Sequence, residues 1–336
     1  MSNAISPWDQ PHHSGCLVQP VSLLRLDGPD TRSFLHGQTS QAVAQAAPGQ
    51  WLRTCCISPT GRMRALAEVL VDASGAWLAI TAGDGGAVRT AFDRVLFPAD
   101  QVQLGTLQTG WLITPLSPGT PAERPEPAGG TWRAVGEPQA EPQAWLLGEE
   151  RLLVQGDDHL PAGLVADLPA AFSSGAPLSA SEHWRIQRGL PAAPNELNDD
   201  TNPFELGLAE RVSLSKGCYV GQETLAKLAT YDGVKQQLRR WHLADATDAT
   251  AAAACTEPGS ELQSADGSRA GLITSALELP DGQGRIGLAL VRRRHLDAVE
   301  LRALGQGEPE SGVMVTLSCP EAFAPPPVGA GSAARL

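Results

Sequence analysis

The stretch "SLSKGCYVGQETLAKL", residues 213–228, places one cysteine between two glycines and then continues in a helical pattern. Gly217 and Gly221 permit positive φ angles or the close approach of another group, which suits a turn that faces a ligand. Gln222 and Glu223 would then present an amide and a carboxylate in the first turn of the helix. The stretch therefore predicts a loop-to-helix turn that is suited to binding or catalysis.

Three interpretations of Cys218 stay open from these residues. Lys216 and the start of the following helix would both favour the thiolate, which is the reactive form of cysteine. The same turn also suits a binding role. In the third interpretation Cys218 and Tyr219 only fill a core while Lys216 is solvated. His183 and His242 could reach the cysteine only through the fold, so no protease-like pair is indicated.

Length and charge limit the class of protein. The chain has 336 residues, which favours two or three domains. Its 25 Lys and Arg against 37 Asp and Glu give a net charge of -12, which opposes nucleic-acid binding and an anionic membrane surface. No signal peptide and no apolar run of about 18 residues is visible. We expect a soluble, cytoplasmic monomer.

Cysteine spacing gives no metal site. The six cysteines include no C-x-x-C pair, no zinc-type Cys/His cluster and no ferredoxin-like spacing. Free thiols in a reducing compartment are the simplest interpretation.

The first part of the chain, residues 18–109, is predicted to be α+β. The segment "PDTRSFLHGQTSQAVAQA" indicates a helix that Asp30 opens and "PGQ" closes. "WLRTCCIS", "PTG" and "MRALAEVLVD" indicate a β-hairpin, "GAWLAIT" a further strand, and "GGAVRTAFDRVLF" a helix with Val88, Phe92 and Leu96 on its apolar face. A sheet with helices on one face follows.

Residues 115–143 are rich in Pro, Gly, Glu and Ala, which predicts an exposed loop. "AWLLGEERLLVQG" resumes strand character, and "SASEHWRIQRGLP" predicts a helix that Ser179 or Ser181 caps and Gly189 ends. The polar, turn-rich segment that follows is expected on a surface or along a cleft.

Short strands with glycine turns after residue 233 predict a small antiparallel barrel, and the Pro-rich tail is expected to be disordered. The predicted division is an N-terminal α+β part (1–114), a Pro-rich loop (115–143), a second α+β part (144–233), a C-terminal β-barrel (234–319) and a tail (320–336).

The eight residues "KGCYVGQE" (216–223) resemble the signature of the YgfZ-type folate-binding proteins. These proteins are a branch of the glycine-cleavage T-protein (aminomethyltransferase) superfamily, which also contains the Iba-type iron–sulfur assembly factors. "LDGPDTRSFLHGQTSQ", "WRIQRGLPAAPNEL", "NPFELGLAERVSLS" and "GSRAGLITSALELPDGQGRIGLALVRR" extend the resemblance. It implies an α+β, T-protein-like arrangement of two intertwined α+β units and a C-terminal antiparallel β-barrel, with tetrahydrofolate or a derivative held near the centre.

The resemblance also implies site residues. Glu196 occupies the position of an acid that receives the pterin ring, and a carboxylate can accept two parallel hydrogen bonds from the pterin's amino group and ring N–H. Arg185 matches an arginine that braces the cleft or pairs with an acid, and Lys216 is placed to meet the glutamyl tail of folate. Cys218 becomes a redox or thiol partner. The other residues expected at the folate site are Gly217, Tyr219, Gly221, Gln222 and Glu223.

One part of the transferase pattern is missing. The positions that carry an acid pair in the T-proteins are Ala65 and Leu66 in this chain. Glu68 follows soon after, but strand alternation gives it an even chance of facing the cleft. Gln41 also departs from the aspartate that many relatives carry. The chain is therefore not expected to be a typical aminomethyltransferase.

Three functions follow as hypotheses. The first is a folate-binding accessory protein for iron–sulfur cluster assembly or repair and the tRNA modification that depends on it, with iron–sulfur assembly proteins or client enzymes as partners. The second is a folate-dependent one-carbon transferase that uses Glu68 or Glu223 as its acid. The third is a non-catalytic interaction module with an acidic surface. Direct nucleic-acid binding is not expected, and the cluster "RRRH" at 292–295 is interpreted as solvated.

Overall fold

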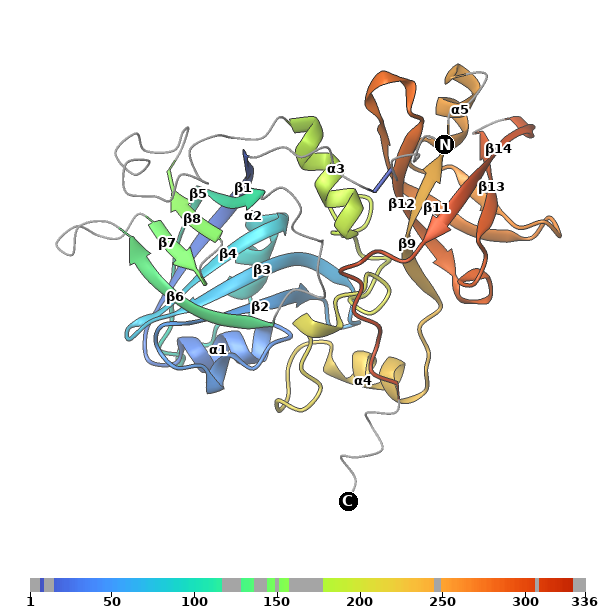
Figure 1. Cartoon of the computed structure of the whole chain (residues 1–336). Coiled ribbons are helices and arrows are strands. Elements are labelled where there is room, and N and C mark those ends of the chain that lie inside the picture. Colours follow the sequence, from blue (N-terminus) through green and yellow to red (C-terminus); the bar gives the residue numbers. More distant parts are fainter. Residues whose placement is uncertain are drawn as a thin grey trace.

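Two closed antiparallel β-barrels make up most of the molecule, and helix α3 lies between them (Figure 1). A computed structural model describes residues 7–8, 15–116, 128–135, 144–148, 151–156, 178–244, 249–305 and 308–328. In this part of the chain, no helix is long and apolar enough to cross a membrane. The predicted α+β fold class, with a C-terminal antiparallel barrel, is confirmed.

The N-terminal barrel has the strand order β1-β4-β3-β2-β6-β7-β8-β5. Of its last three strands in sequence, β6 lies within the Pro-rich region and β7 and β8 lie beyond it, so distant parts of the chain share one sheet. The elements of this half are β1 (Gly15–Asp27), α1 (Thr31–Gln38), β2 (Gln50–Ile57), β3 (Met63–Val71), β4 (Gly75–Gly83), α2 (Gly85–Asp93), β5 (Gln103–Leu116), β6 (Gly129–Val135), β7 (Ala144–Leu147) and β8 (Arg151–Gln155).

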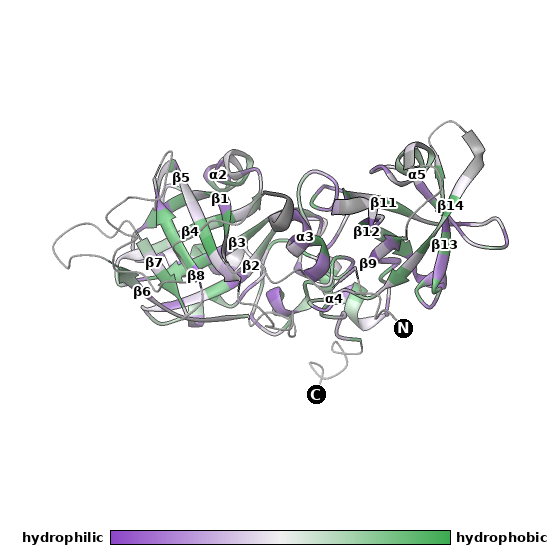
Figure 2. Cartoon of the chain, turned by 45° about the horizontal axis from the view of Figure 1, so that its top comes forward, coloured by the Kyte–Doolittle hydropathy of each residue, from purple (hydrophilic) through white to green (hydrophobic). Residues whose placement is uncertain are grey.

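The predicted hairpin is confirmed: β2 and β3 pair antiparallel around the Pro-Thr-Gly turn. Residues on both faces of β3 are buried, because one face fills the barrel and the other lies under α1 and α2. The near-continuous apolar sequence of β3 reflects this double burial. Most strands of the N-terminal barrel are hydrophobic along much of their length, as the green colour in Figure 2 shows.

Both N-terminal helices are shorter than predicted. Asp30 is the N-cap of α1, as expected, but the helix ends at Gln38 and a separate 3-10 turn (Val43–Gln45) follows. Helix α2 buries Val88 and Phe92, whereas Leu96 lies beyond its end. The polar "TSQ" segment does not continue α1, because it turns inward to contact the second half of the chain.

Part of the predicted Pro-rich loop is a strand. Strand β6 lies within 115–143 and pairs with β2 and β7, so the prediction of a loop is wrong for these residues. "GGTWRAV" has few core residues, and its ladder hydrogen bonds to two neighbouring strands stabilise it instead. The remainder, residues 117–127 and 136–143, lies outside the described residues.

Helix α3 (Leu178–Arg188) ends where predicted, at Gly189, which has a φ of 71°. Ser179 and Ser181 lie inside the helix, so the prediction that one of them is its N-cap is wrong. Helix α3 contacts β11 and β12 of the C-terminal barrel.

The C-terminal barrel has the strand order β10-β11-β12-β9-β14-β13. Its register shifts once in each of the pairs β10–β11, β11–β12 and β13–β14. Trp241 fills its centre and donates its indole N–H to the backbone oxygens of Ser275 and Leu288. The elements of this half are α4 (Gln222–Thr230), β9 (Gln236–Leu243), α5 (Ala249–Thr256), β10 (Glu261–Gln263), β11 (Arg269–Glu278), β12 (Arg285–Arg292), β13 (Glu300–Gly305) and β14 (Glu308–Ser318), with 3-10 turns at Ala209–Arg211, Pro280–Gly282 and Arg293–His295.

One apolar core joins the two barrels. It combines side chains of the β2–β3 hairpin, α3, α4, β9 and β12 around the fully buried Phe204. Residues 201–208, expected on a surface or along a cleft, are all buried here. Burial of a phenylalanine contributes about 1.5–3 kcal/mol, which explains why this polar-looking segment is internal.

The predicted disorder of the tail is wrong for residues 320–328. Phe323 packs against Gly207 and under the guanidinium of Arg239, and Ala324 donates its backbone N–H to the Gly207 carbonyl. Pro320 packs against Gly189 in the same way. Glycines with positive φ provide the space for both contacts, and composition alone does not reveal such docking. Residues 329–336 lie outside the described part of the chain.

Candidate functional site

A cavity of about 230 Å³ lies at the mouth of the N-terminal barrel, beneath α3. Strands β1, β3, β4, β5 and β8 form one side, and α3 with residues 190–192 forms the other. Apolar and charged side chains mix in its walls. The lining residues are Leu17, Val18, Gln19, Pro20, Leu66, Glu68, Thr81, Ala82, Leu112, Thr114, Arg151, Ser181, Glu182, Trp184, Arg185, Leu190, Pro191, Ala192 and Arg211.

A buried ion network forms the barrel side of this cavity. Arg151 donates two hydrogen bonds of 2.7 Å, one to each carboxylate oxygen of Glu68. Arg53 lies 3.6 Å from the same carboxylate, and both guanidinium groups stack on the ring of Trp51. Burial alone raises the pKa of Glu68, but Arg151 and then Arg53 outweigh burial and hold that pKa below its ordinary value. Glu68 therefore stays ionised near neutral pH.

Arg185 lines the opposite wall of the cavity, and Glu196 lies behind it. Arg185 donates to both carboxylate oxygens of Glu182, to the Leu190 carbonyl and to the Ser275 hydroxyl. Its Nη1 also lies 3.6 Å from Oε2 of Glu196. Arg185 thus pairs with Glu182 and Glu196, one of the two roles that the resemblance implied. Its contact with folate stays a prediction.

Glu196 is fully buried behind the cavity wall. Its Oε2 accepts the backbone N–H of Ala192, and its Oε1 accepts the hydroxyl of Ser275. Ala192 lines the cavity and Ser275 belongs to the C-terminal barrel. Glu196 therefore connects the wall to the second barrel from one layer behind the cavity surface.

The two positions that carry acids in the T-proteins are apolar in the structure as well. Leu66 lines the cavity, and Ala65 is fully buried. Neither side chain can exchange a proton. The nearest acid along the strand, Glu68, is committed to Arg151 and Arg53.

Lys216 points to the C-terminal end of α1. Its Nζ donates to the backbone oxygens of Thr39 and Gln41, at 2.7 and 2.8 Å, and to that of His36. Burial lowers its pKa to about 7. The amino group thus caps carbonyl groups that lack helical partners, and its contact with a glutamyl tail stays a prediction.

The two motif glycines act through their backbone. Gly217 and Gly221 have φ angles of 51° and 79°. A Cβ atom on Gly221 would lie 2.6 Å from the Ser58 carbonyl oxygen, so this position brings α4 against the tip of the β2–β3 hairpin. Val220 also donates its N–H to the Gly37 carbonyl. The motif thus joins α1, α4 and the hairpin.

The remaining motif residues divide between the surface and the core. Cys218 is exposed, and Glu223 pairs with Lys227 on the exposed face of α4, next to Gln222. Tyr219 is buried under Lys216 Nζ, which lies 4.3 Å from the ring centre. Among the described cavity-lining residues none comes from "KGCYVGQE", so the contact of this motif with folate stays a prediction.

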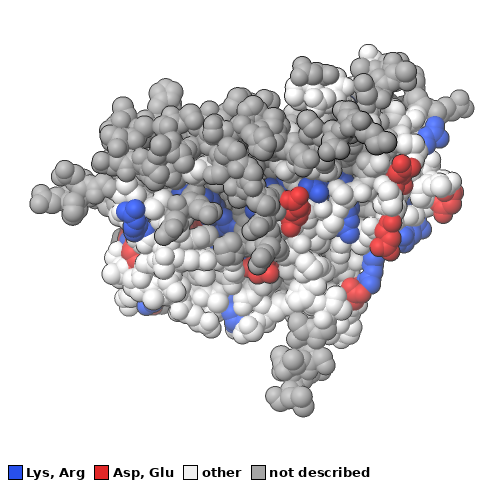
Figure 3. Space-filling model, in the orientation of Figure 1, with Lys and Arg blue, Asp and Glu red and all other residues white. Residues whose placement is uncertain are grey.

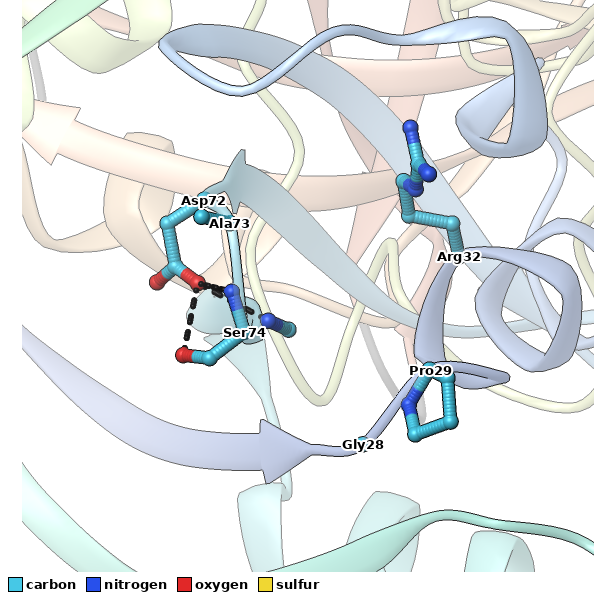
Figure 4. A pocket seen from close by; sticks show the side chains of 7 residues that line it. Gly28, Pro29, Arg32, Asp72, Ala73 and Ser74 are labelled. Carbon is cyan, nitrogen blue, oxygen red and sulfur yellow. Dashed lines mark hydrogen bonds between the residues drawn. The ribbon is translucent and has the colours of Figure 1, made fainter.

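A second, smaller hollow opens on the outside of the N-terminal barrel (Figure 4). Gly28 and Pro29 at the end of β1, and Asp72 and Ser74 in the β3–β4 turn, line it together with Arg32. Asp72 accepts hydrogen bonds from the backbone and hydroxyl of Ser74. These bonds close the turn, so the hollow is explained by local structure.

Acidic and basic side chains are interspersed along the C-terminal barrel (Figure 3). Arg269–Glu261 and Arg285–Glu257 are examples of these surface pairs. Within "RRRH" the three arginines are exposed, in agreement with the interpretation of this cluster as solvated, and Arg293 also pairs with Asp232. Among the residues that the structure describes, no group of three or more His, Cys, Asp or Glu could hold a metal ion.

Comparison with known proteins agrees with this architecture. The fold matches that of the glycine cleavage system aminomethyltransferase T from Bartonella henselae, with a TM-score of 0.67, 15% identity and coverage of 94% of this chain and 88% of that one. The tRNA-modifying protein YgfZ of Klebsiella pneumoniae is 28% identical over 311 residues, or 83% of this chain and 88% of that protein. The chain is a YgfZ-type member of the aminomethyltransferase superfamily.

Other relatives of this YgfZ-type chain differ in their names. A putative chloroplastic transferase of Arabidopsis thaliana is 28% identical over 286 residues, or 81% of this chain, which spans 63% of that protein's length. The mitochondrial iron–sulfur cluster assembly factor IBA57 of Mus musculus is 28% identical over 190 residues, covering 54% of this chain and 46% of that protein. No family model matches the chain.

Sequence reasoning missed several residues of the cavity in this YgfZ-type chain. Arg151 follows the sequence "GEE", and Arg211 lies in a 3-10 turn, so neither has a local pattern that distinguishes it from a surface arginine. Trp184 belongs to the predicted helix α3, but the sequence indicated no functional role for it. The apolar residues before and after Glu68 were the available signal, because a carboxylate inside a buried strand needs a cationic partner.

Proposed function

We propose that the chain is a folate-binding accessory protein that supports assembly or repair of iron–sulfur clusters and the tRNA modification that depends on them. The family relationship supports this role at a coarse level, since relatives carry the names tRNA-modifying protein and iron–sulfur cluster assembly factor. The cavity beside Arg185 and Glu68 is the proposed site of tetrahydrofolate or a derivative. A cytoplasmic location belongs to the same proposal.

The cavity fits part of folate by its chemistry. Leu66, Leu112 and Trp184 provide apolar surface for a flat ring, and the charged groups of Glu68 and Arg151 provide hydrogen-bonding atoms beside it. Binding sites for small molecules combine these two features. Arg185, held by Glu196 from behind, completes the wall on the side of the second barrel.

One observation favours an accessory protein over a transferase. Leu66 lines the cavity, whereas Ala65 lies on the other face of β3, in the core under α1 and α2. These are the two positions where the T-proteins carry acids. Glu68 is an unsuitable general acid, because its ion pairs lower its pKa. Glu223, the other candidate, is exposed and paired with Lys227. Because no suitable acid lies among the described residues of the cavity, we expect the chain to bind folate without transferring a one-carbon group.

A turnover assay tests this proposal against the transferase. The protein is incubated with tetrahydrofolate and an aminomethyl amine, and formation of methylenetetrahydrofolate with release of ammonia is followed. We expect no turnover by the wild type at saturating folate. Turnover that disappears in Glu68→Ala would support the transferase instead.

The iron–sulfur role is tested separately through a client enzyme. Cells that lack this chain should show reduced activity of an iron–sulfur-dependent tRNA thiomethylating enzyme, and expression of the wild type should restore it. The exposed thiol of Cys218 is the proposed contact with partners, so Cys218→Ala should bind folate normally but restore less client activity. Normal client activity in the depleted cells, with partners still co-purifying and no folate affinity, would favour a plain interaction module.

A further inference from the structure

One residue of the "KGCYVGQE" motif is bonded to the structure that holds the cavity wall. The motif supplies none of the described residues that line the cavity, whereas Arg211, shortly before it in the chain, lines the cavity from the 3-10 turn at Ala209–Arg211. Lys216 lies between this turn and the exposed Cys218. The contacts of Lys216 therefore bear on how Arg211 is held.

Residues 39–41 form a bridge segment between Arg211 and the N-terminal barrel. All three residues are buried. Ser40 anchors the segment on β2, because its backbone N–H donates to the Cys55 carbonyl at 3.1 Å and its Oγ accepts the Cys55 N–H at 2.8 Å. Strand β2 belongs to the closed barrel, so one side of the bridge segment is fixed on that barrel.

The other side of the bridge segment holds the turn that carries Arg211. The Ser40 hydroxyl donates to the Arg211 carbonyl at 2.6 Å, and the side-chain amide of Gln41 donates to the Glu210 carbonyl at 3.1 Å. The backbone N–H of Ser213 donates to the Ser40 carbonyl at 2.9 Å. Three hydrogen bonds thus fix the backbone on both sides of the Arg211 side chain.

Lys216 holds the bridge segment itself. Its Nζ donates to the carbonyls of Thr39 and Gln41, which flank Ser40, at 2.7 and 2.8 Å. The residue is only 2% exposed, and its Nζ lies over the ring of Tyr219. A buried carbonyl without a donor is costly, so removal of the amino group would force the bridge segment to find other partners. Ser40 and the turn bonded to it would move with the segment.

The position of Arg211 matters because its charge acts inside the cavity. Burial raises the pKa of Glu68, and Arg211 is one of the three arginines whose charges outweigh burial and lower that pKa. A guanidinium presents its donors in a rigid, planar fork. A ligand therefore receives hydrogen bonds from it only if the backbone beneath the side chain is held in place.

We propose that Lys216 is a positioning residue, which acts through the bridge segment to hold Arg211 in the cavity wall and so supports ligand binding without touching the ligand. The inference rests on the proposed folate function and assigns a role at that site to a motif residue outside the cavity lining. A direct contact between Lys216 and a glutamyl tail is the alternative, and a double-mutant cycle separates the two.

The cycle combines Lys216→Met with Arg211→Met, and tetrahydrofolate is titrated anaerobically by calorimetry into the wild type, both single variants and the double variant. Arg211→Met should weaken binding at least about tenfold and Lys216→Met at least about fivefold. In the Arg211→Met background, Lys216→Met should weaken binding less than about twofold, because the two residues act as one unit. Additive losses, or no loss in either folded single variant, would overturn the proposal. An absence of tetrahydrofolate binding by the wild type would instead refute the proposed function.

Two further variants show whether the effect is specific to the bridge segment. Gln41→Leu removes the donor to the Glu210 carbonyl and leaves Lys216 in place, so it covers the case in which circular dichroism shows Lys216→Met to be unfolded. It should weaken binding at least about threefold, and unchanged binding by folded Gln41→Leu would contradict the proposal. Lys227→Met, which removes an exposed lysine paired with Glu223, is the control and should bind like the wild type. An equal loss in this control would also contradict the proposal.

Hydrogen exchange tests the positioning without folate. Lys216→Met should speed exchange of the Ser213 amide, whose N–H donates to the Ser40 carbonyl, at least about tenfold. The Gly259 amide, which donates to the Ile273 carbonyl in the C-terminal barrel, should exchange at the wild-type rate. Equal exchange at Ser213 in the wild type and in folded Lys216→Met would show that the lysine does not hold the turn, and would overturn the proposal even if folate binds.

Discussion

Both terminal nitrogens of Arg151 lie 2.7 Å from the carboxylate oxygens of Glu68, although 83 residues separate the two in sequence. Glu68 comes from β3 and Arg151 from the first position of β8, so the pair joins the two parts of the chain that close the N-terminal barrel. It also forms one side of the cavity. Fold and candidate site thus depend on the same contact.

Removal of one partner of this pair should be costly. Arg151→Met should lower the free energy of unfolding by about 3–5 kcal/mol, because it leaves a buried carboxylate with weaker compensation. The double variant Glu68→Leu with Arg151→Met should recover much of that loss. Urea unfolding of the single and double variants measures both effects, and additive losses would contradict a direct pairing.

Lys216 should make stability depend on pH. Its pKa is about 7 in the folded chain, below the ordinary value of 10.5, because burial disfavours the charged form. The unfolded chain therefore binds more protons at this residue between pH 7 and 10.5. Its contribution to stability rises with pH through that window and is constant below it.

Lys216→Met isolates this contribution. The difference in unfolding free energy between the wild type and the variant should shift in favour of the wild type as pH increases from 7 to 9.5. Denaturant unfolding at several pH values measures the difference. Parallel pH profiles for the two proteins would show that Lys216 keeps its ordinary pKa.

Gly221 should tolerate no side chain. Gly221→Ala places a Cβ 2.6 Å from the Ser58 carbonyl oxygen at a φ of 79°. Gly267 has the same φ of 79° but no atom within 4 Å of a Cβ. Gly267→Ala should thus cost about 1–2 kcal/mol from backbone strain alone, and Gly221→Ala about 1–3 kcal/mol more. Equal losses in thermal unfolding would remove the argument for close contact with the hairpin.

The docked tail should stabilise the junction between the barrels. Removal of residues 320–336 takes away Pro320 and Phe323, which pack against Gly189 and Gly207. The free energy of unfolding should fall by about 1–3 kcal/mol. Removal of 329–336 alone is the control and should have little effect. Residues 207–208 pair with Ala324. Their backbone amides should exchange hydrogen faster only in the larger truncation. Identical behaviour of both truncations would mean that the tail contributes no stability.

Local sequence patterns predicted the helices and strands better than they predicted which segments pack against one another. The β2–β3 hairpin and the end of α3 at Gly189 follow from turn chemistry and alternation, which act over a few residues. The polar-looking segment 201–208 became core because Phe204 and its neighbours pack between two barrels. Strand β6 and the docked tail likewise depend on surfaces formed elsewhere in the chain.

The same limit applies to the site. The resemblance placed Lys216 beside a ligand, whereas its backbone acceptors in and just after α1 lie 175–180 residues away in sequence. Arg185 could be predicted as a site residue because it matches an arginine of the family pattern. Arg151 matches no such position, and only the closed barrel shows that it is the partner of Glu68.

Tetrahydrofolate binding to the wild-type chain is the most direct test of the account. Anaerobic calorimetry should give saturable binding of one tetrahydrofolate per chain, and the same samples incubated with an aminomethyl amine should form no methylenetetrahydrofolate beyond the rate without protein. Binding without turnover is the result that the account predicts. Absence of binding at millimolar tetrahydrofolate, or catalytic formation of methylenetetrahydrofolate, would contradict it.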